Sequence, residues 1–377
     1  MKLIPLILFL FLVFLSCSNE STTDTEATAL ATDIDINASG LSTKPTRLLV
    51  GIDHLRLRTT PGEKGEEIAY LDKDAVLYEA GEVSDFTTRV KLRGIWFDEP
   101  WIKVKTDKGV EGWVYGGAVT FDMKNPTALS NRLLDLRLNS FFGKGLSSEL
   151  LSYRKAYHSA SNSQDFSIVF SQGEQLRDTM VSILEQKINV LDMDYDQQPD
   201  LFWVEEALPG YETALVAEGT IYYLFQNFKD FQKLANKTKG KEDDDFVNLN
   251  LKVHAADSIE YFYPAWFLQT WDYGGHSLLG QGIHLDILRS ADMDLKKSNL
   301  FLAKIVKIKE DIISDIVDEY ITYWEPADKI KKELDDIIAA DLSILTSEDK
   351  IAIATRRKMF DDHKKNGIEV NHKAGME

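Results

Sequence analysis

The sequence has a single cysteine, Cys17, among its 377 residues. One thiol cannot form an intramolecular disulfide, so no such bridge holds the fold together. A cysteine peptidase needs a thiolate beside a histidine, and this thiol lies in an apolar leader, so that class of enzyme is excluded. The sequence also lacks a close histidine pair such as His-Glu-x-x-His, the usual sign of catalytic zinc. We expect no metal and no cofactor, and we assign no catalytic residue.

Positive charge is scarce as well. Lysine and arginine number 43 against 61 acidic residues, which gives a formal net charge of −18. Most of the excess negative charge falls in residues 122–377. A nucleic-acid partner needs a basic surface to displace counterions from phosphate, and an anionic membrane surface needs one for the same reason, so both are disfavoured. The hydrophobic content of 44% is nevertheless enough for packed cores, and the length suggests two or three domains.

No apolar run is long enough for a typical membrane span, which takes roughly 20 residues. The run at residues 3–15 follows Lys2 and is typical of the apolar part of a signal peptide. Leu15-Ser16-Cys17 closes this run and resembles a bacterial lipobox. The resemblance implies cleavage of a leader over residues 1–17, acyl chains such as palmitate on Cys17, and a lipid-anchored protein of the cell envelope, with the outer membrane favoured over the inner.

Residues 18–45 are rich in Ser, Thr, Ala and Asp and show no apolar period. A segment of this composition is typical of a flexible tether, with a root-mean-square span of roughly 30 Å. The folded part is therefore expected to stand away from the membrane.

Residues 46–122 show the two-residue period of short β-strands separated by turns. The stretches 100–104 and 109–114 predict one hairpin. Residues 82–99 add an insertion whose residues 88–92 also alternate, which favours an extra hairpin there. Several short strands of this kind predict a small barrel.

This region resembles the bacterial SH3-like (SH3b) domain, and the whole chain resembles a lipoprotein of the Bacteroidetes type that carries one. The residues that match the usual motifs are Leu55, Leu57, Arg58, Pro61, Leu71, Lys73, Trp101, Lys103, Val104, Gly109, Gly112, Trp113 and Val114. Asp74 stands where the family has glycine. The match covers about a fifth of the chain and implies a small all-β SH3-like barrel.

Residues 123–366 have a helical period and are not recognised as a known family. Leu176, Met180, Leu184 and Ile188 are spaced four apart, as are Ile308, Ile312, Ile316 and Tyr320, so each set predicts one helix face. Further helices are predicted at about 128–140, 146–158, 211–235, 245–270, 279–290, 297–324, 327–342 and 347–365. We therefore expect a larger all-α domain after the barrel, with a frayed polar tail at residues 367–377.

Aromatic residues give the candidate ligand contacts: Trp96, Phe97, Trp101, Trp113 and Tyr115. The family resemblance places Trp101 and Trp113 in the barrel core. Trp96 and Phe97 lie in the insertion, so they are the predicted exposed patch, which could dock the helical domain or an extended peptide.

A second candidate region runs from His254 to His284, where aromatic, acidic and histidine residues are dense. Together with Glu205, Glu206, Glu212 and Glu218, it could form a metal or acid/base site, although His276 is separated from His254 by Gly274-Gly275. Gly275-His276-Ser277-Leu278-Leu279 misses the serine-hydrolase elbow, because Leu279 replaces the second glycine.

These patterns favour an envelope-facing lipoprotein that acts as a binding or scaffolding module, with a cell-wall or envelope-protein ligand for the SH3-like domain and no nucleic-acid partner. The first alternative is a hydrolase with a site in the helical domain near His254 and His276. The second is that the barrel only packs against the helical domain and binds nothing.

Overall fold

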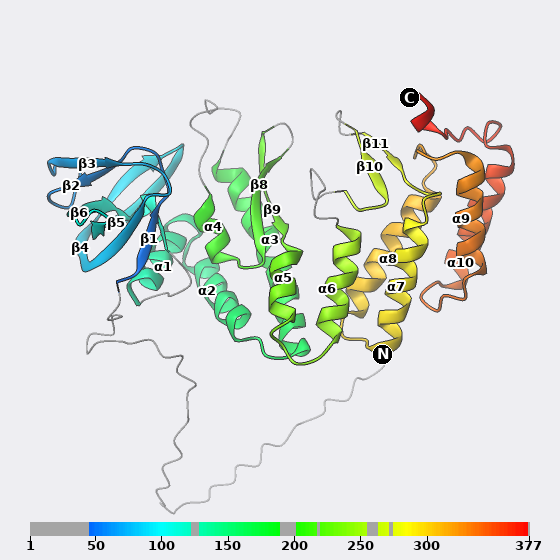
Figure 1. Cartoon of the computed structure of the whole chain (residues 1–377), viewed down its shortest axis with the longest axis horizontal. Helices are drawn as coiled ribbons and strands as arrows, with labels where there is room; N and C mark the ends of the chain where they lie inside the picture. The colour runs from blue at the N-terminus through cyan, green and yellow to red at the C-terminus, as the bar shows by residue number, and fades with distance from the viewer. Residues whose placement is uncertain are drawn as a thin grey trace, which may run out of the picture.

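The computed structural model describes residues 45–121, 128–188, 201–216, 219–254, 263–270 and 274–375. The predicted leader with Cys17 and almost all of the predicted tether lie outside the described residues. An antiparallel sheet occupies one end of the molecule, and the helices follow it in a row (Figure 1). None of the helices in the described ranges has a stretch both long and apolar enough to cross a membrane.

The sheet has seven strands. They are β1 (Arg47–Val50), β2 (Leu55–Arg58), β3 (Glu67–Leu71), β4 (Val76–Leu92), β5 (Ile95–Thr106), β6 (Glu111–Tyr115) and β7 (Val119–Phe121). Their order is β3-β2-β6-β5-β4-β1-β7. No pairing joins β3 to β7 among the described strands, so the sheet is open, and the closed barrel expected from the sequence is not found.

The predicted hairpin is confirmed, because β5 pairs with β6 from Trp101 opposite Tyr115 to Lys105 opposite Glu111. Gly109 turns the chain between them with a φ of +80°, in the left-handed region that favours glycine. Gly112 has a second reason to be glycine, since a Cβ there would lie 2.7 Å from a carbon of Leu57. The insertion forms the predicted second hairpin, in which β4 and β5 pair as far as Leu92 opposite Ile95.

The helices carry their apolar residues on one face. They are α1 (Ala128–Phe142), α2 (Lys144–Ser159), α3 (Ser163–Lys187), α4 (Phe202–Ala207), α5 (Phe228–Ala235), α6 (Glu242–Val253), α7 (Ile283–Lys297), α8 (Leu302–Val317), α9 (Ala327–Ala339) and α10 (Ser347–Met359). All four predicted apolar positions from Leu176 to Ile188 are buried, as are Ile308, Ile312 and Ile316. Tyr320 was wrongly placed with them, since α8 ends at Val317 and the tyrosine is 91% exposed.

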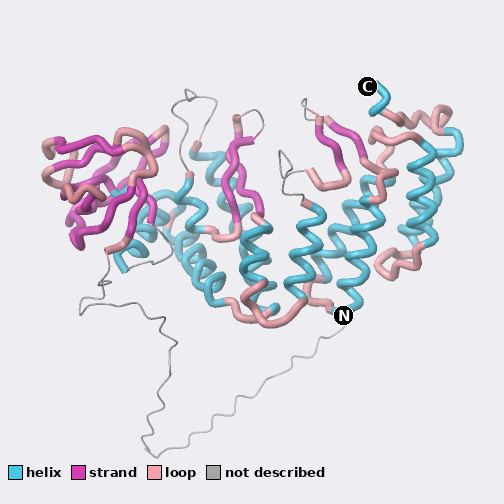
Figure 2. The backbone as a smooth tube through the Cα atoms, in the orientation of Figure 1, coloured by secondary structure: helices cyan, strands magenta, loops and turns pink. Residues whose placement is uncertain are grey.

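The region after the sheet is not all-α. It contains two hairpins, β8 (Tyr211–Val216) with β9 (Ile221–Gln226), and β10 (Phe267–Gln269) with β11 (Gly275–Ser277). The predicted helix 211–235 was therefore wrong over residues 211–216 and 221–226, and the predicted helix 245–270 was wrong over residues 267–269. Residues 221–225 are β-branched and aromatic with one leucine, and such residues favour strands. Figure 2 shows both hairpins on the same side of the row of helices.

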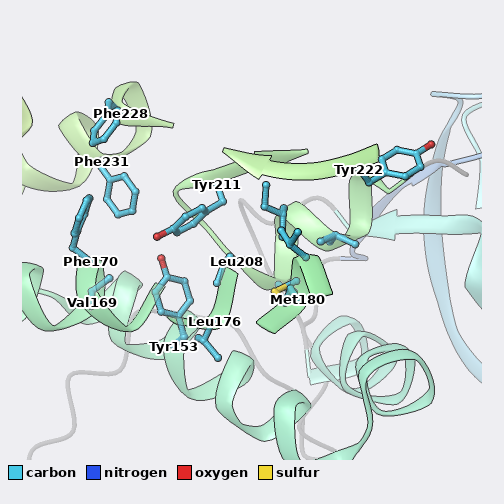
Figure 3. Close-up of a cluster of buried hydrophobic side chains, with 14 of the residues drawn as sticks. Tyr153, Val169, Phe170, Leu176, Met180, Leu208, Tyr211, Tyr222, Phe228 and Phe231 are labelled. Carbon is cyan, nitrogen blue, oxygen red and sulfur yellow. The ribbon is translucent and has the colours of Figure 1, made fainter. Parts of the chain in front are cut away.

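One continuous cluster of buried apolar side chains runs from the sheet through the helices. Figure 3 shows the part in which Tyr153 and Tyr211 direct their hydroxyl groups toward each other. The Tyr153 hydroxyl donates a hydrogen bond to the carbonyl of Pro209 (2.6 Å). Phe231 lies at the centre of the aromatic packing, with ring centroids 5.0 Å from Phe170 and 5.8 Å from Tyr211.

The polar tail is bound rather than frayed as far as residue 375. Ile368 is buried, and the amide of Asn371 donates to the carbonyl of Glu325 (3.0 Å). The Lys373 ammonium lies 2.6 Å from the Glu325 carboxylate. The expectation of fraying was wrong because one apolar residue and one ion pair anchor this short segment.

Candidate functional site

The two aromatic residues of the insertion, Trp96 and Phe97, point to opposite faces of strand β5. Successive side chains of a strand point to opposite faces, and β5 follows this rule from Ile95 to Glu99. Trp96 is 52% exposed, whereas Phe97 is 4% exposed. Phe97 packs edge-on against Trp203 of α4, with ring centroids 5.9 Å apart. The predicted exposure is therefore found for Trp96 and was wrong for Phe97, which docks the sheet onto the helices.

The other three candidate aromatics differ in burial. Trp101 and Tyr115 are buried edge-to-face neighbours with ring centroids 5.6 Å apart, and Trp113 is half-buried. Thr88 holds both buried rings, since its hydroxyl accepts from the Trp101 indole (2.9 Å) and its carbonyl accepts from the Tyr115 hydroxyl (2.7 Å). Among the five candidates, Trp96 offers the most exposed ring.

Trp96 borders a cavity of about 370 Å³, which we call the Trp96 groove. Its lining comes from the insertion, from the end of α1 and from the end of α3. The lining residues are Arg89, Gly94, Ile95, Trp96, Phe97, Asp98, Ser140, Phe141 and Lys187. The groove therefore exists only where the sheet and the helices meet.

Two cations border the Trp96 groove, and the sequence patterns did not single them out. The Arg89 guanidinium lies over the Trp96 ring, 4.9 Å from its centroid. The Lys187 ammonium lies 4.8 Å from the Phe141 ring and donates to the Phe141 carbonyl. Neither cation has a carboxylate partner among the described residues, so each can contact an acceptor on a ligand.

A buried ion pair fixes the wall of this groove. Arg137 of α1 and Glu99 of β5 are both fully buried, and the Arg137 Nε donates to a Glu99 carboxylate oxygen (2.7 Å). Arg137 also donates to the carbonyls of Gly116 and Val119. Burial raises the pKa of Glu99, and the Arg137 charge opposes that rise. The pair joins the sheet to α1 in one orientation.

Another cavity, of about 630 Å³, lies between the β1–β7 edge of the sheet and α2 and α4. Glu206 borders it and accepts a hydrogen bond from the amide of Phe121 (3.2 Å). His158 also borders it, and its pKa is lowered by burial and by the charges of Arg154 and Lys237. Two of the glutamates noted in the sequence, Glu205 and Glu206, meet here rather than beside the histidines of the second region.

The structure does not bring His254 and His276 into one site. His254 stacks on Phe228 with ring centroids 5.3 Å apart, whereas His276 stacks on His372 at 4.3 Å and lies 2.7 Å from the Thr322 hydroxyl. Glu212 accepts from Asn227 instead of facing a histidine. Glu218, Asp257, Glu260, Tyr261, Trp271, Asp272 and Tyr273 lie outside the described residues.

His284 and Ser277 belong to a buried polar network. The His284 Nε2 and the Ser277 hydroxyl both contact the same oxygen of Asp315, at 2.8 Å and 2.6 Å. On the other side, Glu333 accepts from the amides of Gly280 and Gly282. Since the serine is bonded to the aspartate and all of these side chains are buried, the network holds the loop before α7 and does not present a nucleophile.

No cluster of three or more metal-ligating side chains occurs within the described ranges. Comparison of the chain with protein-family models, with curated proteins and with solved structures finds no match in any of the three. We therefore infer function from the geometry of the molecule itself.

His254 gives a prediction for acid pH. Burial lowers its pKa from 6.5 to about 4, with the Asp311 charge acting in the opposite sense. A lowered pKa for a base means that the folded state binds the proton less well than the unfolded state. The neutral His254 ring therefore stabilises the folded state relative to the protonated ring. This contribution to the free energy of unfolding is complete above pH 6.5 and is lost as pH falls toward 4. Between pH 7.5 and 4.5, we expect the wild-type chain to lose about 2 kcal/mol more of its free energy of unfolding than His254→Gln.

Urea denaturation of both chains at the two pH values measures this difference, and contributions from other groups cancel in the comparison. An identical loss in the two chains would show that the ring is not kept neutral by burial.

Proposed function

We propose that this chain is a lipid-anchored protein of the bacterial envelope that binds a partner through an SH3-like N-terminal module. The positions of the motif residues support the SH3-like assignment. Leu55 and Leu57 are buried on β2, and Trp101 to Val104 and Trp113-Val114 lie on the paired strands β5 and β6. The extended β4–β5 hairpin is an addition to this pattern, and it carries Trp96.

The single observation that carries the binding proposal is the exposed ring of Trp96 at the edge of a groove. Trp96 leaves 52% of its surface in solvent and borders a groove, so a partner can contact the ring and the groove together. Tryptophan and arginine are the side chains that most often dominate binding energy, and Arg89 lies on the Trp96 ring. The Glu99–Arg137 ion pair joins β5 to α1, two of the elements that form the groove, so the groove is preorganised for a partner.

The partner class follows from charge and location. A net charge of −18 disfavours nucleic acid, and the resemblance to envelope SH3-like domains favours a cell-wall or envelope-protein ligand. The acyl chains on Cys17 supply the membrane attachment. Fatty-acid labelling that persists in Cys17→Ser would remove the anchor from this proposal.

Co-sedimentation with purified cell-wall sacculi and pull-down from solubilised envelope test the binding. Replacing Trp96 by alanine should weaken binding by about tenfold or more, because aromatic anchors contribute a large part of interface energy. Tyr320→Ala is the matched control, since Tyr320 is a 91% exposed aromatic that does not border the groove.

The hydrolase alternative requires His254 and His276 to act together, and their separate contacts do not favour it. The packing-only alternative explains Phe97 and Arg137 but gives no role to Trp96. Unimpaired binding by the Trp96→Ala chain would favour the packing-only alternative.

A further inference from the structure

A third cavity, of about 440 Å³, lies far from the Trp96 groove along the chain. The end of α6 and residues 263–267 form one wall, and α8 with the segment after it forms the other. The lining residues are Val253, His254, Tyr263, Pro264, Trp266, Phe267, Ile308, Asp311, Ser314, Asp315, Asp318 and Ile321. The volume is in the range of sites that enclose a small organic molecule.

The α8 wall is acidic and contains no lysine or arginine. Asp311, Asp315 and Asp318 are four and three residues apart, so they follow one line along the helix and its C-cap. Asp315 is engaged with Ser277 and His284, and Asp311 pairs with Lys307. The Asp318 carboxylate accepts from the amide of Tyr320 (2.8 Å) and forms no ion pair among the described residues, while the Arg356 guanidinium donates to the Asp318 backbone carbonyl (2.7 Å).

The opposite wall is aromatic. Tyr263 and Phe267 stack with ring centroids 5.3 Å apart and an interplanar angle of 14°. Trp266 is 4% exposed, and its indole N–H has no acceptor among the described residues. Trp266 borders the cavity. One residue of this wall therefore carries a donor that has no acceptor among the described residues.

We propose that this cavity binds a small organic cation whose ammonium group lies between the aromatic wall and Asp318. Ring faces attract ammonium groups, most strongly where water is excluded, and the carboxylates supply the opposite charge. A hydroxyl or carbonyl oxygen on the ligand would satisfy the Trp266 N–H. The observations on Asp318 and on Trp266 are independent of each other, and neither depends on the proposed partner of Trp96.

Isothermal titration of the purified chain with choline tests the proposal. The neutral comparison is 3,3-dimethylbutan-1-ol, which has the same shape and hydroxyl without the charge. We expect choline to bind at least roughly tenfold more tightly than the neutral analogue. Asp318→Asn should remove most of that preference, whereas Glu319→Gln, an adjacent exposed acid that does not border the cavity, should keep it.

Asp318 is exposed, so the asparagine variant should keep the melting temperature of the wild-type chain, and circular dichroism checks this. Equal binding of choline and its neutral analogue, no heat with either, or an unchanged preference in Asp318→Asn would each overturn the proposal. Loss of the preference in Glu319→Gln as well would show only a general attraction of cations to an acidic protein.

Discussion

Arg137→Ala should lower the free energy of unfolding by about 3–5 kcal/mol, the usual cost of removing one partner of a buried ion pair. The arginine and Glu99 are both fully buried, so no water can replace the lost partner. The Glu99 pKa is already raised by burial, and without the arginine charge it should rise further. Two backbone carbonyls, of Gly116 and Val119, lose their donor as well.

Arg132→Ala is the matched control, because Arg132 lies on the same helix and is exposed. Urea denaturation of both variants at pH 7 gives the comparison. The combination Glu99→Gln with Arg137→Met should recover part of the loss, since it removes both charges together. A loss below about 1 kcal/mol in Arg137→Ala would show that water reaches Glu99. Since Arg137 lies outside residues 46–122, an isolated sheet fragment would keep Glu99 without its partner.

Phe97→Ala should lower the free energy of unfolding by about 3–5 kcal/mol. Trp96→Ala should change the free energy of unfolding by about 0.5 kcal/mol or less. The two residues are adjacent, but Phe97 fills the space against Trp203 and Trp96 faces solvent. Alanine at 97 would leave a cavity at the junction of the sheet and the helices. The same denaturation experiment on the two single variants measures the difference.

A small effect of Phe97→Ala would mean that the sheet and α4 are not packed as described. A large effect of Trp96→Ala would mean that its ring is part of the core, and the binding proposal would lose its main observation. The contrast between neighbours in one strand makes the test sharp, because the variants share the same local backbone.

The sequence was sufficient to predict features that depend on local periodicity. The β5–β6 hairpin followed from alternation around Gly109, and the buried face of α3 followed from the spacing of Leu176, Met180 and Leu184. The same local rule, applied fully, would have separated Trp96 from Phe97, because the insertion was already predicted to be a hairpin. The error was to treat two adjacent strand residues as one patch.

The features that could not be predicted depend on contacts between distant segments. Glu99 and Arg137 are 38 residues apart, and neither stands out in the sequence as half of a buried pair. Lys187 borders the Trp96 groove from the last turn of α3, and its place in the sequence does not mark it as a groove residue. The helix predicted at 211–235 failed for a different reason. Its apolar content suits either structure, and the β-branched and aromatic residues at 221–225 together with Gly219 favoured a hairpin.

The most direct test of the binding proposal is a co-sedimentation titration of the wild-type chain, Trp96→Ala and Tyr320→Ala with purified sacculi and with solubilised envelope protein. If Trp96 anchors the partner, the wild-type and Tyr320→Ala chains should share one dissociation constant, and that of Trp96→Ala should be at least about tenfold higher at an unchanged melting temperature. Equal dissociation constants for all three chains, or no binding by the wild-type chain to either material, would contradict the proposal that this protein binds an envelope partner through the Trp96 groove.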